Sequence, residues 1–190
     1  MNRPALRRGS WRWRPGRAGT AAVEMALITP MLLILLTSII DFSRVYYEEI
    51  TLSAGVAAAS QYALINAANV NSTNAATLAA SLSGIVANSN ATRWASASAT
   101  VNDGATNAIN NGTTTTSGAA ANANSCWCPT GATGSWTWGS ATTCGNACAG
   151  GTLAGKFVTV AGTRSFVAIF GNYGLITNTT LHQSTIVQVQ

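Results

Sequence analysis

Few side chains in this chain could support acid–base or nucleophilic chemistry. Its 190 residues include a single histidine, His182, and five carboxylates, which are Glu24, Asp41, Glu48, Glu49 and Asp103. Hydrolytic or transfer chemistry usually needs a base paired with an acid, an activated nucleophile or a metal cluster. The sequence places no such set beside His182. It therefore predicts a protein that is not an enzyme and that holds no cofactor or catalytic metal.

The four cysteines form a second group of chemically reactive side chains. Cys126 and Cys128 are separated by one residue, and Cys144 and Cys148 by three. Four thiolates can hold a structural zinc ion, but these two spacings are unusual for such a site. An even number of cysteines in an exported domain favours disulfides, and a bridge from Cys126 to Cys128 would be strained. We expect two bridges between the pairs, crossed or nested.

Positive charge is concentrated at the N-terminus. Six of the ten basic residues lie within the first 17 positions: Arg3, Arg7, Arg8, Arg12, Arg14 and Arg17. The rest of the chain has four basic residues against five acidic ones, a net charge of −1. A nucleic-acid-binding protein would carry its basic surface on the folded part, so nucleic acid is not an expected partner. A basic leader next to an apolar run instead indicates membrane topology.

The apolar run itself covers residues 25–40 and contains no charged residue. Extended back to Thr20 it has 21 residues and one ionisable group, Glu24. A bilayer core of ~30 Å needs ~20 apolar residues in a helix, so we expect a membrane span, with Pro30 kinking the helix but not ending it. The arginines before the span predict a cytoplasmic N-terminus and export of the C-terminal part.

A cleavable secretory signal is the competing interpretation of the same run. It requires small residues soon after the apolar core. The first A-x-A pattern, at residues 57–59, comes 17 residues after Ile40 and beyond four charged groups. The Arg7-Arg8 pair lacks the apolar residues directly after it that twin-arginine export would need. We therefore expect the span to remain in the protein.

The start of the apolar run resembles the processing site of type IV prepilins. Gly19 ends a basic leader, Glu24 is the fifth residue beyond it, and an apolar helix follows. The resemblance implies that a membrane-embedded prepilin peptidase cuts between Gly19 and Thr20, and that Glu24 sets the register between subunits. The new α-amine on Thr20, with a pKa of ~7.7–8.0, would be mostly charged at neutral pH. It could then pair with Glu24 of a neighbouring subunit.

A closer resemblance is to the TadE-like family, the minor pilins or pseudopilins of the tight-adherence (Tad, Flp) pilus machinery. It covers residues 17–65 well, and the C-terminal strands weakly. The positions that match the family pattern are Glu24, Pro30, Asp41, Phe42 and Arg44. Met25 departs from it, because a phenylalanine is usual there.

This second resemblance implies a role in pilus assembly, in support of adhesion or biofilm formation. The implied partners are the prepilin peptidase, other pilin and pseudopilin subunits, the Tad inner-membrane assembly platform and membrane lipid. The precursor would sit in the inner membrane with a periplasmic C-terminal domain, and the subunit could end in an extracellular pilus. The alternative is a generic single-span anchored protein whose exported domain binds or adheres to something.

Taken together, these observations predict an α+β protein in three parts. Residues 1–19 would be a basic cytoplasmic leader, residues 20–68 one long helix that spans the membrane at about 20–40, and residues 69–190 an exported domain. A helix of that length measures ~73 Å at ~1.5 Å per residue, so more than half of it must project from the bilayer. We expect it to carry a small antiparallel sheet. The further expected elements are a helix at 75–86, an exposed loop or flexible hairpin at 103–124, and strands at 93–101, 156–161, 164–170 and 181–190.

Overall fold

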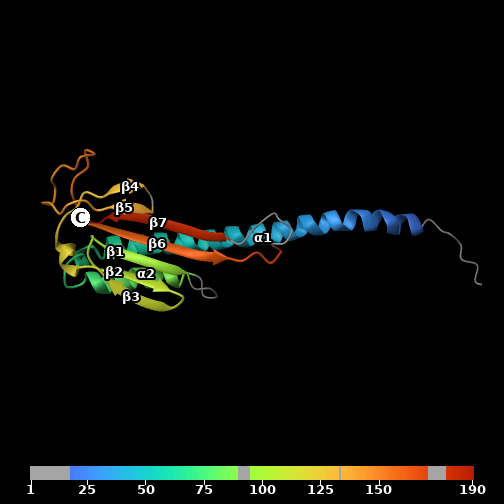
Figure 1. Ribbon diagram of the computed structural model, residues 1–190, viewed down its shortest axis with the longest axis horizontal. Helices are drawn as coiled ribbons and strands as arrows, with labels where there is room; N and C mark the ends of the chain where they lie inside the picture. The colour runs from blue at the N-terminus through green and yellow to red at the C-terminus, as the bar shows by residue number, and fades with distance from the viewer. Residues whose placement is uncertain (1–17, 90–94, 133, 171–178) are drawn as a thin grey trace, which may run out of the picture.

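The computed structural model describes residues 18–89, 95–132, 134–170 and 179–190 (Figure 1). The molecule is elongated, with one long helix that runs into a small α+β domain. The six arginines of the predicted basic leader, and Arg93, lie outside the described residues.

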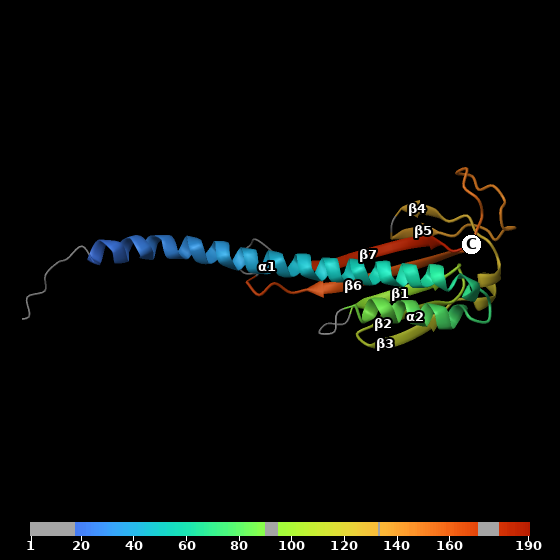
Figure 2. The ribbon, with the colours of Figure 1, turned by 180° about the vertical axis from the view of Figure 1, so that it is seen from behind.

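The long helix α1 spans Ala18–Ile65, 48 residues without a break. Its N-terminal half consists mostly of leucine, isoleucine, methionine and alanine, and it continues through Pro30. Hydroxyl groups in and just after this half bond within the helix, as Ser38 and Ser43 do to the carbonyl four residues earlier, both at 2.7 Å. The N-terminal half projects free of the rest of the protein (Figures 1 and 2).

The second helix, α2 (Ala75–Ala87), folds back along the C-terminal half of α1 after a short 3-10 turn, η1 (Ala67–Asn69). The Asn71 side chain accepts hydrogen bonds from the backbone N–H groups of Thr73 and Asn74 at 3.0 and 2.9 Å. This local bond fixes the turn that leads into α2. Alanines with no exposed surface, Ala59 and Ala63 on α1 and Ala79 on α2, let helices and sheet approach closely.

One five-stranded antiparallel sheet lies against both helices, in the order β3-β2-β1-β6-β7. The strands are β1 (Ser96–Val101), β2 (Thr106–Asn110), β3 (Thr113–Ser117), β6 (Phe157–Phe166) and β7 (Thr179–Gln188). Alternate residues of β1 and β6 point into the core, the period-2 pattern of a half-buried sheet. The largest buried aliphatic side chains are Leu52, Leu82, Val70, Val86, Val101, Val158 and Val160.

Gly162 allows β6 to lie directly against the helices. A Cβ atom at this position would lie 2.7 Å from Val86 Cγ1 and 2.9 Å from Leu52 Cδ1. Those distances are shorter than real Cβ contacts, so any larger residue would have to displace the Val86 and Leu52 side chains from this packing.

A disulfide-bonded segment follows the edge strand β3 in the chain. It contains the 3-10 helix η2 (Ala120–Asn124) and the hairpin of β4 (Thr130–Ala132) and β5 (Ser135–Thr137), which lies beside β7. Disulfides join Cys126 to Cys144 and Cys128 to Cys148. The two bridges are crossed, one of the two arrangements expected from the spacing.

The predicted fold class, a long N-terminal helix followed by an antiparallel-sheet domain with disulfides, is confirmed. Of the two alternatives expected for residues 103–124, an exposed loop or a hairpin, the structure has a hairpin, and one further segment differs from expectation. The Asn/Thr-rich segment 103–124 contains the strands β2 and β3, whose turn places Asn111 and Gly112 at φ of 47° and 79°. This Asn-Gly pair is the residue choice that a tight hairpin turn requires. The two strands expected at 156–161 and 164–170 are a single strand, β6, because Gly162 is accommodated by packing and does not break the ladder.

Candidate functional site

The predicted processing residues lie at the exposed start of α1. Gly19, Thr20 and Glu24 are all solvent-exposed in the helix, and a Cβ atom added to Gly19 would meet nothing within 4 Å. The most apolar stretch of α1 is long enough and apolar enough to cross a membrane, and none of it is buried within the protein. Because a soluble protein would bury such a surface, α1 is suited to single-pass membrane anchoring of the disulfide-bonded domain.

Asp41 is the first charged residue after the apolar run, and it binds the chain that follows β6. Its two carboxylate oxygens accept hydrogen bonds from the backbone N–H groups of Ile169 and Phe170 at 3.1 and 2.9 Å. Burial by itself raises the pKa of this carboxyl, but the two N–H donors and the nearby Arg44 outweigh it and hold the pKa below its ordinary value. Asp41 is therefore an ionised acceptor that joins residues 128 positions apart.

Arg44 reinforces the same junction. Its Nη1 lies 3.4 Å from Asp41 Oδ1 and donates to the carbonyl of Val167 at 3.5 Å. The guanidinium carbon also lies 5.2 Å from the centroid of the Phe166 ring, within the range of a cation–π contact. We call Asp41 and Arg44 together the lower clamp. They fix the end of β6 to α1, and they lie at the end of the domain that is nearer the apolar half of α1.

A second junction lies two helical turns further along α1. Arg164 Nη1 lies 2.8 Å from Glu48 Oε2, and both side chains are almost completely buried. The same guanidinium donates to Thr51 Oγ1 at 3.0 Å and to Ser89 Oγ at 3.1 Å. This upper clamp, Glu48 with Arg164, joins α1, β6 and the end of α2.

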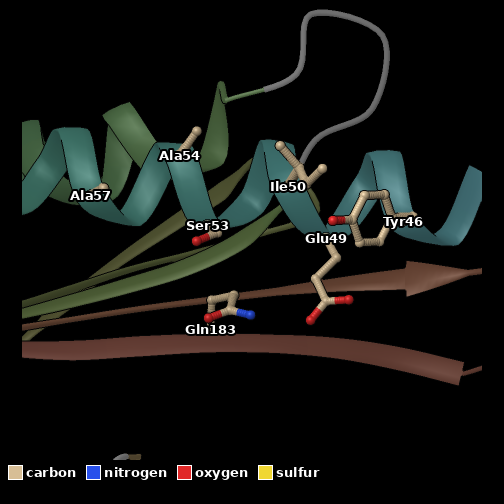
Figure 3. A pocket seen from close by; sticks show the side chains of 7 residues that line it. All are labelled: Tyr46, Glu49, Ile50, Ser53, Ala54, Ala57 and Gln183. Carbon is tan, nitrogen blue, oxygen red and sulfur yellow. The ribbon is translucent and has the colours of Figure 1, made fainter.

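A groove of about 460 Å³ runs between the exposed side of α1 and β7 (Figure 3). Small side chains line one part of its helical wall, and the Glu49 side chain extends from α1 toward the strands. The lining residues are Tyr46, Glu49, Ile50, Ser53, Ala54, Ala57 and Gln183. The groove is open and mostly apolar, with one carboxylate available to a basic partner.

The disulfide segment is held to the sheet domain by Asn102. Its side-chain amide donates to the carbonyls of Ala123 and Ser125, and its carbonyl oxygen accepts from the N–H of Phe157 at 3.1 Å. Trp127 packs edge-on against Trp138, with 6.5 Å between ring centroids and 73° between planes. This aromatic pair belongs to the segment that the two crossed bridges close.

The structure does not gather the predicted residues into one site. Glu24 lies in the N-terminal, free half of α1, whereas the four cysteines belong to the disulfide-bonded segment of the folded domain at the other end of the molecule (Figure 1). His182 is exposed on β7 opposite Thr163. Among the described residues, no group of three or more His, Cys, Asp or Glu side chains could hold a metal ion.

Both clamps were missed by reasoning from the sequence. Asp41 and Arg44 entered only as positions that match a family pattern, and Glu48 only as a charge after the span. The spacing of the two carboxylates could have indicated a common contact surface, because Asp41 and Glu48 are seven residues apart and so lie on the same face of the helix. Arg164 also stands at an inward position of an alternating strand. Nothing in the sequence pairs that arginine with Glu48.

Comparison with known proteins finds a match over most of α1. A family model described as TadE-like protein matches residues 19–61. No curated protein and no solved structure matches the chain. The matched residues begin at Gly19 and include Glu24, the apolar span and the α1 residues of both clamps. The resemblance to the TadE-like family is thus confirmed, and it implies involvement in the Tad pilus system.

Proposed function

We propose that this protein is a minor pilin or pseudopilin of the Tad (Flp) pilus machinery, without catalytic activity of its own. The observation that carries the proposal is the unbroken helix α1, which joins Gly19 and Glu24 to a folded, disulfide-bonded domain. The match to TadE-like proteins covers the same helix. Such a helix can anchor the subunit in a membrane and later pack among other subunits.

The proposed topology places residues 1–19 in the cytoplasm, the span at about 20–40 in the inner membrane and residues 69–190 in the periplasm. The leader charge supports this orientation under the positive-inside rule. The two disulfides support an oxidising compartment for the C-terminal domain.

A prepilin peptidase would then cut between Gly19 and Thr20. The exposed position of Gly19 supports this assignment, because among the described residues outside the helix itself nothing lies within 4 Å of a Cβ atom placed there. The α-amine released on Thr20 would lie close to the membrane boundary, where a carboxylate is a favourable partner. Glu24 of an adjacent subunit would supply it and so set the axial register between subunits.

The groove beside Glu49 is the proposed contact for other pilin or pseudopilin subunits and for the inner-membrane assembly platform. Ser53, Ala54 and Ala57 present small side chains along one face of α1. Small residues let helix backbones approach closely, which favours helix–helix packing. Through the pilus, the protein would support adhesion or biofilm formation.

Counting pili tests the proposal against a generic anchored binding protein. Cells that lack this chain should lose most of their Flp pili in electron micrographs, and the wild-type chain should restore them. A chain whose disulfide segment alone is altered separates the two functions, because a binding domain would lose attachment while pili remain. Normal piliation without the protein would contradict a role in assembly.

A further inference from the structure

The chain that follows β6 presents apolar side chains beside the membrane end of the folded domain. Val167 and Ile169 are 53% and 61% exposed. They belong to the segment 166–170, which continues from β6 along α1 toward its apolar half (Figures 1 and 2). Nothing in the described part of the domain covers them.

The position of this segment along α1 matches the edge of the bilayer. Residues 20–40 measure about 32 Å at 1.5 Å per residue, which is close to the ~30 Å of a hydrocarbon core. Asp41, the next residue, binds the N–H groups of Ile169 and Phe170. The segment 166–170 is therefore held at the level where the span leaves the core.

The hydrogen bonding of the segment suits a place with little water. In water, exposed backbone N–H groups need no carboxylate, whereas near lipid each one must find a partner. Here a nearly buried carboxylate accepts from two successive N–H groups, and Arg44 donates to the carbonyl of Val167.

The helix at the same level carries exposed aromatic side chains. Phe42 is exposed, as are Tyr46 and Tyr47 one turn further on. Aromatic rings gather at the headgroup level of membrane proteins. Helix and segment therefore both present apolar or aromatic side chains at the level where the span ends.

We propose that residues 166–170 enter the headgroup region of the bilayer, so that the folded domain contacts the membrane directly and not through α1 alone. The occupant of this surface is lipid. The lower clamp sets how deep the segment sits, because it ties the backbone of 169–170 to the first residue after the span. The inference rests on the single-pass anchoring described above, and it holds whether or not the protein takes part in a pilus.

Spin labelling tests the proposal on the full-length chain in vesicles of phosphatidylethanolamine and phosphatidylglycerol. Single substitutions Leu33→Cys, Leu153→Cys and Ile169→Cys place a label in the span, on the disulfide segment and on the proposed membrane contact. The three native side chains have similar exposures of 55%, 58% and 61%. Mass analysis without reductant verifies that both native disulfides remain.

Accessibility to oxygen, which partitions into lipid, is compared with accessibility to a water-soluble nickel chelate. We expect the oxygen-to-nickel ratio at residue 169 to shift from the low value of residue 153 toward the high value of residue 33. A ratio equal to that of residue 153 would overturn the proposal while residue 33 still showed insertion. Low accessibility of residue 169 to both reagents would also overturn it, because a protein contact would then cover the segment. If residue 33 itself were accessible to nickel, the anchoring on which the inference rests would fail.

Discussion

Arg164 Nη1 and Glu48 Oε2 lie 2.8 Å apart, although 116 residues separate them in the chain. This buried pair joins a strand of the sheet to the helix that carries the membrane span. Because isolated buried charges are costly, the pair constrains how the domain can sit on α1.

Breaking this pair should destabilise the exported domain. Glu48→Gln leaves the buried guanidinium without its carboxylate, and removal of one partner of a buried pair typically costs ~3–5 kcal/mol. Denaturant unfolding in detergent, followed by tryptophan fluorescence, measures the loss. Glu49→Gln, at the adjacent exposed position, is the matched control. The double variant Glu48→Gln/Arg164→Met should recover part of the stability, and equal stability of Glu48→Gln and the control would contradict this role.

Processing should occur between Gly19 and Thr20 and leave 171 of the 190 residues, with a net charge of −1. Intact mass of protein purified from membranes measures it. Gly19→Phe should leave the precursor uncut, and because the position is sterically open, loss of cleavage would not reflect misfolding. Gly84, also open to a Cβ, provides a control substitution to alanine in the folded domain. An uncut chain in cells with active prepilin peptidase would disprove the assignment.

Glu24 should matter for assembly more than for insertion. Glu24→Ala removes a charge that disfavours membrane burial, so the amount of inserted protein should be unchanged or higher. Pilus number or recovery of partner subunits should fall. Quantitative blotting of membranes, together with pilus counts, separates the two effects. Normal piliation at a normal protein level would rule out pairing between Glu24 and the α-amine.

The disulfides should determine the protease resistance of the segment they close. Each bridge closes a loop of about twenty residues, worth ~3 kcal/mol in the chain-entropy model. Cys128→Ser or Cys144→Ser should therefore make the domain protease-sensitive while α1 stays inserted. Ser140→Ala, an exposed change in the same segment, should not. Alkylation of all four cysteines in native, non-reduced protein would show that the bridges are absent, and stoichiometric zinc would favour the metal site instead.

The lower clamp should weaken in acid. The folded protein holds the pKa of Asp41 below the ordinary value of 3.8, so it favours the ionised form. The contribution to stability is therefore complete above 3.8 and is lost as the pH falls through the lowered pKa. Hydrogen exchange of the Ile169 and Phe170 amides, corrected for intrinsic rates, should accelerate in that range. Asp41→Asn should exchange faster than the wild type above that range and lose this dependence, and unchanged exchange would contradict it.

Periodicity and composition were sufficient to predict the long helix, the second helix and most of the sheet. The apolar run is as long as a helix that spans a bilayer must be. The alternation of side chains along the strands predicted β1 and β7 with boundaries correct to within a few residues. The hairpin of β2 and β3 was predicted only as one of two alternatives, because strands rich in threonine and asparagine carry little apolar alternation and the Asn111-Gly112 turn was not recognised.

The disulfide pairing and the two clamps were harder to predict from the sequence than the fold. Cysteine spacing limited the pairing to crossed or nested bridges, and three-dimensional placement chose the crossed one. Both clamps depend on contacts more than 100 residues apart. A single sequence contains no information that would associate Asp41 with backbone amides, since every residue but proline offers the same donor.

The rigidity of α1 has an angular consequence. At 3.6 residues per turn, Asp41 and Glu48 differ by only about 20° around the helix axis, whereas Glu24 is rotated by about 100° from Asp41. Both clamps therefore hold one side of the rod, and the domain cannot swivel about it. Any contact that fixes the rotation of Glu24 about the helix axis in the bilayer therefore also fixes the direction in which the sheet edge and the disulfide segment face. These lie some 40 Å or more away along the helix.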